Sequence, residues 1–319
     1  MPAFEQLRRR VRNADELLAV VRTMKVLAAV NIRHYQQAVI ALDEYCTTIE
    51  QGFQVVLPLL GNQQPPPPDN AGLPAPPAAV AFPVPPAGDG AAAPGRCAAV
   101  VFGSDQGLCG QLNRQIAAHA RTALAADGIP AGQCLLIAVG ARAADCCAAA
   151  GWPPQESIPL PATRAGITPL VQELLLLLDD WHTRRKVDRI FLCHHAYQPG
   201  NASQPQTVRY LPVDPDWLRE LAARPWPSRS LPVIRMDPEQ LLAALTREHL
   251  FTRLYRACAQ SLASEHAARL AAMQRAEKNI TEHGRELRRQ FHRMRQAAIT
   301  DELLDIVAGS EALAAAPAG

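Results

Sequence analysis

Two long stretches at opposite ends of the chain show a helical pattern of hydrophobic and polar positions. The first covers residues 1–57, with its apolar pattern starting near Phe4, and its only glycine is Gly52. The second covers residues 238–309 and is broken only by Gly284. Helices in globular domains average about 11–12 residues, so both stretches predict unusually long helices. A soluble helix of that length needs a partner along its apolar face, and we expect the two to form a long antiparallel coiled coil.

Heptad spacing places apolar or small residues of the first stretch in two rows. The first row comprises Val21, Ala28, Tyr35, Leu42 and Ile49. The second row comprises Leu17, Met24, Asn31, Ala38 and Tyr45. Two such rows predict a coiled-coil seam, in which the polar residue Asn31 would fix the register.

The C-terminal stretch carries a matching pattern and recognisable ends. Its predicted seam comprises Leu270, Met273, Ile280, Leu287, Phe291, Met294 and Ala298. Asp237 followed by Pro238 is a typical helix start, because an acidic side chain caps the first free N–H groups and proline fits the first turn. Gly309 predicts the helix end, which leaves residues 310–319 as a tail.

Between the helices, two further regions differ in composition. Residues 58–95 are rich in proline, including the run 65–68, which predicts an extended linker rather than a helix or a central strand. This linker is either a tolerated surface insertion or a ligand for a proline-binding domain. In residues 96–237, apolar strand-like segments alternate with helical ones. That order predicts an α/β fold with a small, mostly parallel, Rossmann-like sheet.

The expected strands and helices of residues 96–237 can be given individually. Strands are predicted at 97–102, 135–139 and 187–193, with 207–211 as a hairpin partner of the last. Helices are predicted at 110–126, 141–150 and 167–181. The whole chain is thus expected to have five parts: the helix 1–57, the linker 58–95, the α/β domain 96–237, the helix 238–309 and the tail.

Composition argues against several classes of protein. The formal net charge is +2, which gives no basic footprint for nucleic acid. The longest strongly apolar run, residues 174–178, is far shorter than a membrane span, and the charged N-terminus lacks the apolar core of a signal peptide. The eight cysteines show no C-x-x-C spacing, so we expect buried apolar thiols rather than disulfides or a metal site. The sequence Cys193-His194-His195 superficially suggests a metal cluster, but it follows an apolar run and is better interpreted as a strand end.

One loop carries the strongest candidate chemistry. The segment from Gly103 to Gly110 follows a predicted strand and opens a predicted helix, which is where phosphate-binding turns occur. It matches neither G-x-G-x-x-G nor a P-loop. Cys109 stands near a helix N-terminus, which favours a thiolate, but no histidine is placed by the sequence to activate it. Catalysis by this loop is therefore a weak hypothesis, and no catalytic residue, cofactor or metal is predicted.

The same loop resembles a family signature. Residues Ser104, Asp105, Gly107, Leu108, Cys109 and Gly110, followed by Leu112 and Asn113, resemble the loop after the first strand in the gamma subunit of F-type ATP synthases. Three further segments, 22–29, 262–273 and 295–309, resemble that family's helical termini in the same order. The resemblance therefore covers nearly the whole chain except the proline-rich stretch.

The resemblance implies a function and a set of partners. A gamma subunit is the non-catalytic central rotor shaft that couples ion flow through the membrane c-ring to ATP synthesis or hydrolysis at beta-subunit sites. Its partners would be the alpha and beta subunits, the epsilon subunit and the c-ring, with protons or sodium as the coupling ion. It would lie peripherally on the cytoplasmic face of a bacterial plasma membrane, attached only through the complex.

Matching of motifs also implies roles for individual residues. Arg295, Gln296 and Thr300 would contact catch loops of the beta subunits, and Met24 and Lys25 would lie at the neighbouring level. At the end of the C-terminal helix, Ile306 and Val307 would form the apical bearing. The sequence departs from the family pattern at Asn31, Gln106 and Gln111. Without the resemblance, Arg295 would be interpreted as a solvated surface charge and Met24 and Met294 as seam residues.

Two alternatives use the same sequence features differently. In the first, the chain is a structural adaptor whose coiled coil presents an α/β domain to a partner. In the second, it is a small α/β enzyme that depends on Asp105 or Cys109. The rotor hypothesis predicts dependence on nucleotide turnover in a complex, the adaptor predicts binding without it, and the enzyme predicts activity of the isolated chain.

Overall fold

The structure of the chain, a computed structural model, describes residues 2–61, 96–198, 203–230 and 232–314. Its elements, in chain order, are α1 (Pro2–Gly61), β1 (Arg96–Phe102), α2 (Leu112–Ala126), β2 (Cys134–Val139), α3 (Ala141–Ala149), β3 (Glu156–Ile158), α4 (Ile167–Arg185), β4 (Val187–Ala196), β5 (Gln204–Leu211), α5 (Pro215–Ala223) and α6 (Pro238–Ala314). The chain divides into two compact units. We call Met1–Ala29 with Arg269–Gly319 the helical-pair unit and Val30–Ala268 the sheet unit.

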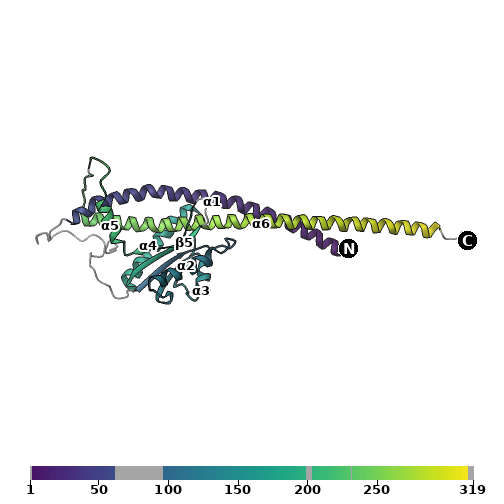
Figure 1. The fold of residues 1–319 in the computed structure, drawn as a ribbon, viewed down its shortest axis with the longest axis horizontal. Coiled ribbons are helices and arrows are strands. Elements are labelled where there is room, and N and C mark those ends of the chain that lie inside the picture. The colour runs from purple at the N-terminus through teal and green to yellow at the C-terminus, as the bar shows by residue number, and fades with distance from the viewer. Residues whose placement is uncertain (1, 62–95, 199–202, 231, 315–319) are drawn as a thin grey trace. The chain divides into compact units, whose positions relative to one another are not determined.

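The sheet unit is built on one five-stranded sheet (Figure 1). Its strand order is β3-β2-β1-β4-β5. Strands β3, β2, β1 and β4 run parallel, and β5 pairs antiparallel with β4. The first strand lies at the centre, and the chain crosses over through helices on both sides, as in Rossmann-like folds. The predicted α/β class and the hairpin between the last two strands are both confirmed.

Two hydrophobic cores cover the two faces of this sheet. Alternation along β1 sends Ala98, Val100 and Phe102 into one core, and Cys97, Ala99 and Val101 into the other. The first core also takes residues from α4 and from the parts of α1 and α6 in this unit. The second takes residues from α2 and α3. Because both faces are covered, the central strands β1 and β2 consist almost entirely of apolar runs instead of alternating with polar residues.

Within the sheet unit, α1 and α6 pack antiparallel against each other and against the sheet. The rings of Tyr35 and His266 stack with centroids 5.6 Å apart, and Arg256 forms an ion pair of 2.5 Å with Asp43. Ser264 is fully buried and donates a hydrogen bond of 3.2 Å to the His195 carbonyl. Small side chains on α6 therefore bring this helix close to β4.

The helical-pair unit contains only the N-terminal part of α1 and the C-terminal part of α6. Phe4 stacks on Phe291 at 4.8 Å between centroids, and Asp15 pairs with Arg288, so the two helices run antiparallel. The core consists of Leu7, Ala14 and Leu287, with Val11, Ile280 and Phe291 partly buried beside it. The antiparallel pair predicted from the two apolar patterns is confirmed.

Burial confirms one predicted heptad row of α1 and only part of the other. Val21, Ala28, Tyr35, Leu42 and Ile49 are all buried. In the second predicted row, Ala38 is buried at 7%, but its two end members, Leu17 and Tyr45, are 57% and 45% exposed. The positions that pack beside the first row lie one residue later, at Leu18, Lys25, Ile32 and Val39. Both choices have heptad spacing, and only the side on which the partner helix lies distinguishes them.

The helix ends also differ in part from the sequence predictions. Asp237 accepts a hydrogen bond from the Gln240 N–H, which confirms the predicted start of α6. The predicted stop at Gly309 is wrong, because α6 continues to Ala314. The predicted linker start at Pro58 is also too early, since Pro58 lies inside α1 and, close to the helix end, removes only one backbone donor. The rest of the proline-rich stretch lies outside the described residues, and the predicted domain boundaries remain predictions.

Candidate partner-binding surfaces

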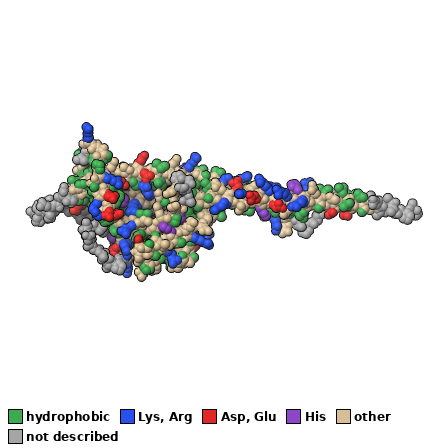
Figure 2. Space-filling model, viewed as in Figure 1, with side chains coloured by type: hydrophobic (Ala, Val, Ile, Leu, Met, Phe, Trp, Pro, Cys, Tyr) green, Lys and Arg blue, Asp and Glu red, His purple; other side chains and the backbone are tan. Residues whose placement is uncertain are grey.

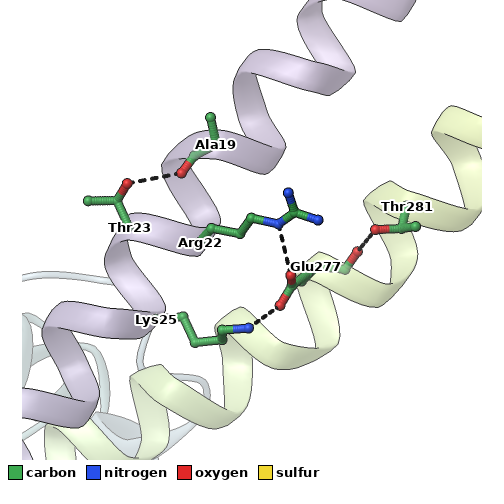
Figure 3. Close-up of polar contacts among 6 residues, drawn as sticks. All are labelled: Ala19, Arg22, Thr23, Lys25, Glu277 and Thr281. Carbon is green, nitrogen blue, oxygen red and sulfur yellow. Dashed lines mark hydrogen bonds and ion pairs between the residues drawn. The ribbon is translucent and has the colours of Figure 1, made fainter.

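An ionic cluster lies in the seam of the helical-pair unit (Figure 3). Lys25 occupies a seam position of α1, and its Nζ lies 2.6 Å from Oε2 of Glu277 on α6. The Nε of Arg22, one turn earlier, donates to Oε1 of the same carboxylate at 3.0 Å. Both oxygens of Glu277 are therefore occupied by cations from the opposite helix. These hydrogen bonds, from Lys25 first and then from Arg22, lower the pKa of Glu277.

This cluster explains how a lysine is accommodated in the seam. The side chain of Lys25 is 33% exposed and that of Glu277 is 22% exposed, so the pair is partly shielded from water. Charges at such positions are costly unless they are paired. The paired charges are therefore compatible with this register of the two helices and disfavour registers that leave Lys25 unpaired, a role in specificity that the sequence had suggested for Asn31. Met24 is half-buried directly beside it.

The outer face of α1 in this unit carries exposed apolar side chains. Leu17, Val20 and Leu27 are 57%, 54% and 58% exposed. With Met24 they follow each other at spacings of three and four residues, so they form one stripe along the helix. Exposed apolar stripes of this kind mark surfaces that bind other proteins.

The C-terminal part of α6 has no helix beside it within the described part of its unit. Every residue from 292 to 308 is exposed, including Arg295, Gln296 and Thr300. In the described part of the chain, Arg295 has no carboxylate at ion-pair distance, whereas Arg293 pairs with Glu286 at 3.4 Å. The hydroxyl of Thr300 donates back to the Gln296 carbonyl at 2.9 Å, which leaves the hydroxyl oxygen available as an acceptor.

Hydrophobic side chains recur along this exposed end of α6, as the green atoms in Figure 2 show. The exposed fractions are 65% for Ile306 and 51% for Val307. Ile299, Leu303 and Leu304 are also between 46% and 61% exposed. Runs of exposed apolar side chains are typical of surfaces that bind other proteins, which makes this segment a candidate partner-binding surface.

The signature loop between β1 and α2 is held by a small hydrogen-bond network in the sheet unit. The Ser104 N–H donates to Oδ1 of Asn113 at 2.9 Å, and Nδ2 of Asn113 donates to the Ser104 hydroxyl at 2.8 Å. The same hydroxyl donates to the Gln106 carbonyl at 2.8 Å. Asn113 thus ties the loop to the first turn of α2.

Asp105 ties the loop to two other segments. Its Oδ1 accepts from the Ala141 N–H and its Oδ2 accepts from the Leu160 N–H, each at 2.8 Å. Gly140, with φ of 109°, lies so close that a Cβ would come within 2.9 Å of the Ser104 backbone. The aspartate therefore caps α3 and holds three loops together, and both of its oxygens are in use.

The remaining loop residues divide into buried and exposed positions. Cys109 is 3% exposed, with its Sγ 3.4 Å from the Ser104 hydroxyl. Leu108 is 58% exposed and has φ of 66°, a left-handed conformation that is uncommon for a residue with a branched side chain. Gly110, with φ of 65°, lets the chain turn into α2. Gly107 is exposed. The loop therefore buries its thiol and presents a leucine to solvent.

Metal sites and membrane-spanning helices are both absent from the described residues. No group of three His, Cys, Asp or Glu side chains there is arranged to hold a metal ion. No helix in the same ranges is both long and apolar enough to cross a membrane. Cys193, His194 and His195 lie in β4 as a continuation of the strand.

Sequence reasoning missed Arg22 and Glu277 as members of a site. Glu277 stands between Met273 and Ile280 of the predicted C-terminal seam, which was a signal that a charge would face the partner helix. Its partner was hidden because the seam of α1 was placed one residue too early. The row one residue later would have identified Lys25 as the opposing charge.

Comparison with known proteins agrees with these features. A family model described as ATP synthase matches residues 3–313. The ATP synthase gamma chain of Chlorobaculum parvum is 26% identical over 316 residues, covering 98% of this chain and 99% of the relative. That of Anaeromyxobacter dehalogenans is 28% identical over 322 residues, covering 98% and 100%. That of Bacteroides fragilis is 32% identical over 224 residues, covering 68% and 74%.

Solved structures with the same fold are parts of ATP synthases. A chain of the Euglena gracilis mitochondrial ATP synthase, in the assembly of OSCP, F1 and c-ring in rotational state 3, matches with a TM-score of 0.62 and 16% identity. The alignment covers 98% of this chain and 95% of that one. A chain of the Euglena rotor in rotational state 1 matches with a TM-score of 0.57 and 14% identity, covering 93% and 99%. The family match over nearly the whole sequence shows that this chain belongs to the gamma-subunit family of F-type ATP synthases.

Proposed function

We propose that this chain is the central rotor shaft of its ATP synthase and that it turns inside a ring of alternating alpha and beta subunits. The observation that carries this proposal is the exposed end of α6, where apolar and basic side chains lie uncovered over residues 292–308. A surrounding sleeve of subunits would cover these side chains without clamping them, which rotation requires.

The charge of the helical-pair unit supports contacts with acidic loops of the partners. Its described residues include a basic belt on both helices, which comprises Arg8, Arg9, Arg10, Arg12, Arg285, Arg288, Arg289, Arg293 and Arg295. Some of these cations are paired within the chain, for example Arg289 with Glu286. Arg295 is the member proposed to bind the beta catch loops, together with Gln296 and Thr300. Complementary charge of this kind guides association more than it adds affinity.

The ionic cluster refines the proposed role of Met24 and Lys25. The ammonium of Lys25 is engaged by Glu277, so we propose that the catch loops meet the apolar side chain of Met24 and the stripe beside it. Lys25 would then act mainly by positioning the two helices. Ile306 and Val307 would form the apical bearing, where weak apolar contacts allow sliding.

The sheet unit is proposed to form the foot, which binds the epsilon subunit and the c-ring. Exposed Leu108, on a loop fixed by Asp105 and Asn113, offers a preorganised apolar anchor for such a partner. The complex would lie on the cytoplasmic face of the bacterial plasma membrane and hold this chain there as a peripheral subunit.

We further propose that the chain has no catalytic activity of its own. The carboxylate of Asp105 is used to hold loops, and the thiol of Cys109 is buried, so neither group is presented to a substrate. The structural-adaptor alternative shares the coiled coil and the α/β domain. It differs in predicting that binding does not affect nucleotide turnover.

Co-expression with the alpha and beta subunits of the same genome tests the proposal. One copy of this chain per three alpha and three beta subunits in native mass spectrometry is expected, with ATPase activity that requires the chain. Arg295→Ala with Gln296→Ala should change the turnover rate by several-fold. Arg184→Ala, an exposed arginine of α4 that pairs with Asp180, is the matched control and should leave the rate unchanged. Assembly at another ratio, or turnover that is unaffected by the chain, would favour the adaptor.

A further inference from the structure

Two thiols lie side by side in the second core of the sheet unit. Cys97 is the second residue of β1 and Cys134 is the first residue of β2, and the two are direct partners in the parallel ladder. Their Sγ atoms are 2.8 Å apart. Their exposed fractions are only 2% and 3%. The ladder therefore holds the two sulfurs together irrespective of any partner protein.

The geometry is compatible with a covalent bond. Neighbouring strands lie about 4.7–4.9 Å apart, which is within the Cα separations of about 4.4–6.8 Å that disulfides bridge. A disulfide bond is about 2.05 Å long, so the sulfurs would have to approach by less than about 1 Å. Cys97 adjoins the register shift between Arg96 and Cys97 against β4, at an end of the strand where small adjustments are tolerated.

The surroundings of Cys97 and Cys134 shift the pKa values of the two thiols in opposite directions. The hydrogen bond with Cys134 lowers the pKa of Cys97, and burial opposes this shift. The same hydrogen bond, with burial, raises the pKa of Cys134. Cys97 is thus favoured as the thiolate, which is the nucleophilic form, and Cys134 as the neutral thiol that hydrogen-bonds to it.

The other two buried cysteines of this core, Cys147 and Cys193, differ from Cys97 and Cys134 in pKa and in their neighbours. Burial raises the pKa of Cys147 and of Cys193 to about 12, which keeps both as thiols. Cys193 faces Val101 in the ladder and accepts a hydrogen bond of 3.4 Å from Thr207. No second pair of cysteines stands opposite each other in the described strands.

We propose that Cys97 and Cys134 are an oxidation site and form an intramolecular disulfide when the protein meets a peroxide. The Cys97 thiolate attacks one oxygen of hydrogen peroxide, and with one proton this gives a sulfenic acid and water. The Cys134 sulfur then attacks the sulfenic sulfur, the S–O bond breaks, and a second water leaves with the Cys134 proton. In total, two thiols are oxidised to one disulfide, and one peroxide is reduced to two waters.

The position of Cys97 and Cys134 in the fold shows how peroxide could reach them and how a disulfide there would affect stability. The connection from Asp127 to Gln133, which leads into β2, is largely exposed, and its opening would admit a molecule as small as peroxide. The disulfide would enclose the signature loop and α2 in one covalent ring. Oxidation is therefore expected to raise the denaturation midpoint of the sheet unit, and a thiol reductant should reverse this.

The test treats the reduced full-length chain with hydrogen peroxide and then blocks free thiols with an alkylating reagent. The intact mass should fall by about 2 Da before alkylation, as two hydrogens are lost. Trypsin cleaves after Arg96, Arg114, Arg121 and Arg142. Cys97 and Cys109 therefore share a peptide, so fragmentation must assign the link to Cys97, the first residue of that peptide.

Matched variants separate this pair from the other thiols. Cys134→Ala should abolish the linked peptide, and Cys147→Ala, which removes a buried thiol of the same core, should leave it in place. The wild-type peptide map decides the question even if Cys134→Ala does not fold. Links at Cys46 or Cys146, addition of two or three oxygens at Cys97, or alkylation of both Cys97 and Cys134 after treatment would each overturn the proposal.

Discussion

The two units of this chain achieve stability in different ways. The sheet unit encloses fully buried side chains on both faces of its sheet, for example Leu174 and Trp181 at 0% exposure. The helical-pair unit has a narrow core around Leu7, Ala14 and Leu287, each still 4–9% exposed. It also leaves large apolar side chains such as Leu304 and Ile306 open to solvent. The comparison indicates that the sheet unit is stable by its own packing, whereas the helical-pair unit reserves much of its apolar surface for partners.

Truncating one core leucine in each unit should give the largest difference between the units in the loss of stability. Leu174→Ala leaves a cavity closed on all sides and should lower the free energy of unfolding by about 2–5 kcal/mol. Leu287→Ala opens a seam that water can reach and should have a smaller effect. All four tryptophans lie in the sheet unit, so tryptophan fluorescence in urea measures the first change, and amide hydrogen exchange measures the second.

The control for this prediction lies on the same helix. Leu176 is 70% exposed, so Leu176→Ala should change stability by less than about 0.5 kcal/mol. An equal loss for Leu174→Ala and Leu176→Ala would contradict the assignment of α4 to a closed core.

The next largest loss of stability is expected in the sheet unit, from a substitution in the signature loop between β1 and α2. Asp105→Ala removes the acceptor of two backbone N–H groups, at Ala141 and Leu160, and should cost about 2–3 kcal/mol. Asp145→Ala, which removes a carboxylate that is 70% exposed, is the control and should be nearly neutral. Urea denaturation followed by tryptophan fluorescence gives both values. A neutral Asp105→Ala would show that the loop is held by Asn113 alone.

Acid should affect the sheet unit selectively. Burial lowers the pKa of His194, His195 and His249 to about 4, and all three belong to this unit. The unfolded chain, with a histidine pKa of about 6.5, binds more protons between these values, so stability is full above about pH 6.5 and falls toward pH 4. At pH 5.5 the loss is expected to be about 1 kcal/mol for each histidine.

Tryptophan fluorescence in urea at pH 7.5 and 5.5 measures this dependence. His194→Gln keeps a polar side chain that can hydrogen-bond with Gln260 and should make the pH dependence weaker. An unchanged dependence in this variant would assign the effect to other groups.

The difference between the units also explains what the sequence could predict. The sheet unit was predictable because apolar strands and helical segments alternate, and its strands appeared within a few residues of the expected positions. Strand β3 was missed because its three residues, Glu156–Ile158, are too few to show a pattern. Helix α5 was missed although Asp214 and Pro215 repeat the start signal that was recognised at Asp237 and Pro238.

The helical-pair unit was predictable only in outline. Periodicity identified the buried row through Val21 and Ala28, but two neighbouring rows have the same spacing, and the choice between them depends on the partner helix. For the same reason the contact between Lys25 and Glu277 was missed. The roles of Arg295, Gln296 and Thr300 came from the resemblance and stay predictions, because exposure on α6 is equally expected for a contact surface and for a solvated helix face.

The smallest expected change in stability comes from a substitution in the ionic cluster. This substitution should alter the ATPase rate of the complex while leaving the stability of the helix pair nearly unchanged. Glu277→Gln keeps the shape of the side chain but removes the charge that holds Lys25 and Arg22, so both cations become available to acidic loops of the partners. Amide hydrogen exchange of the variant should match that of the native chain, because the cluster is partly exposed. The ATPase rate of the assembled complex should fall about two- to fivefold, since each ion pair that the released Lys25 or Arg22 forms with a partner loop must be broken during rotation.

Glu286→Gln, which releases Arg289 and Arg293 on the same helix, is the matched control. It should lower the ATPase rate less than Glu277→Gln if position in the seam matters more than charge alone. Equal rates for the native chain and Glu277→Gln would mean that the cluster serves the helix pair only, and that Lys25 makes no contact with the ring.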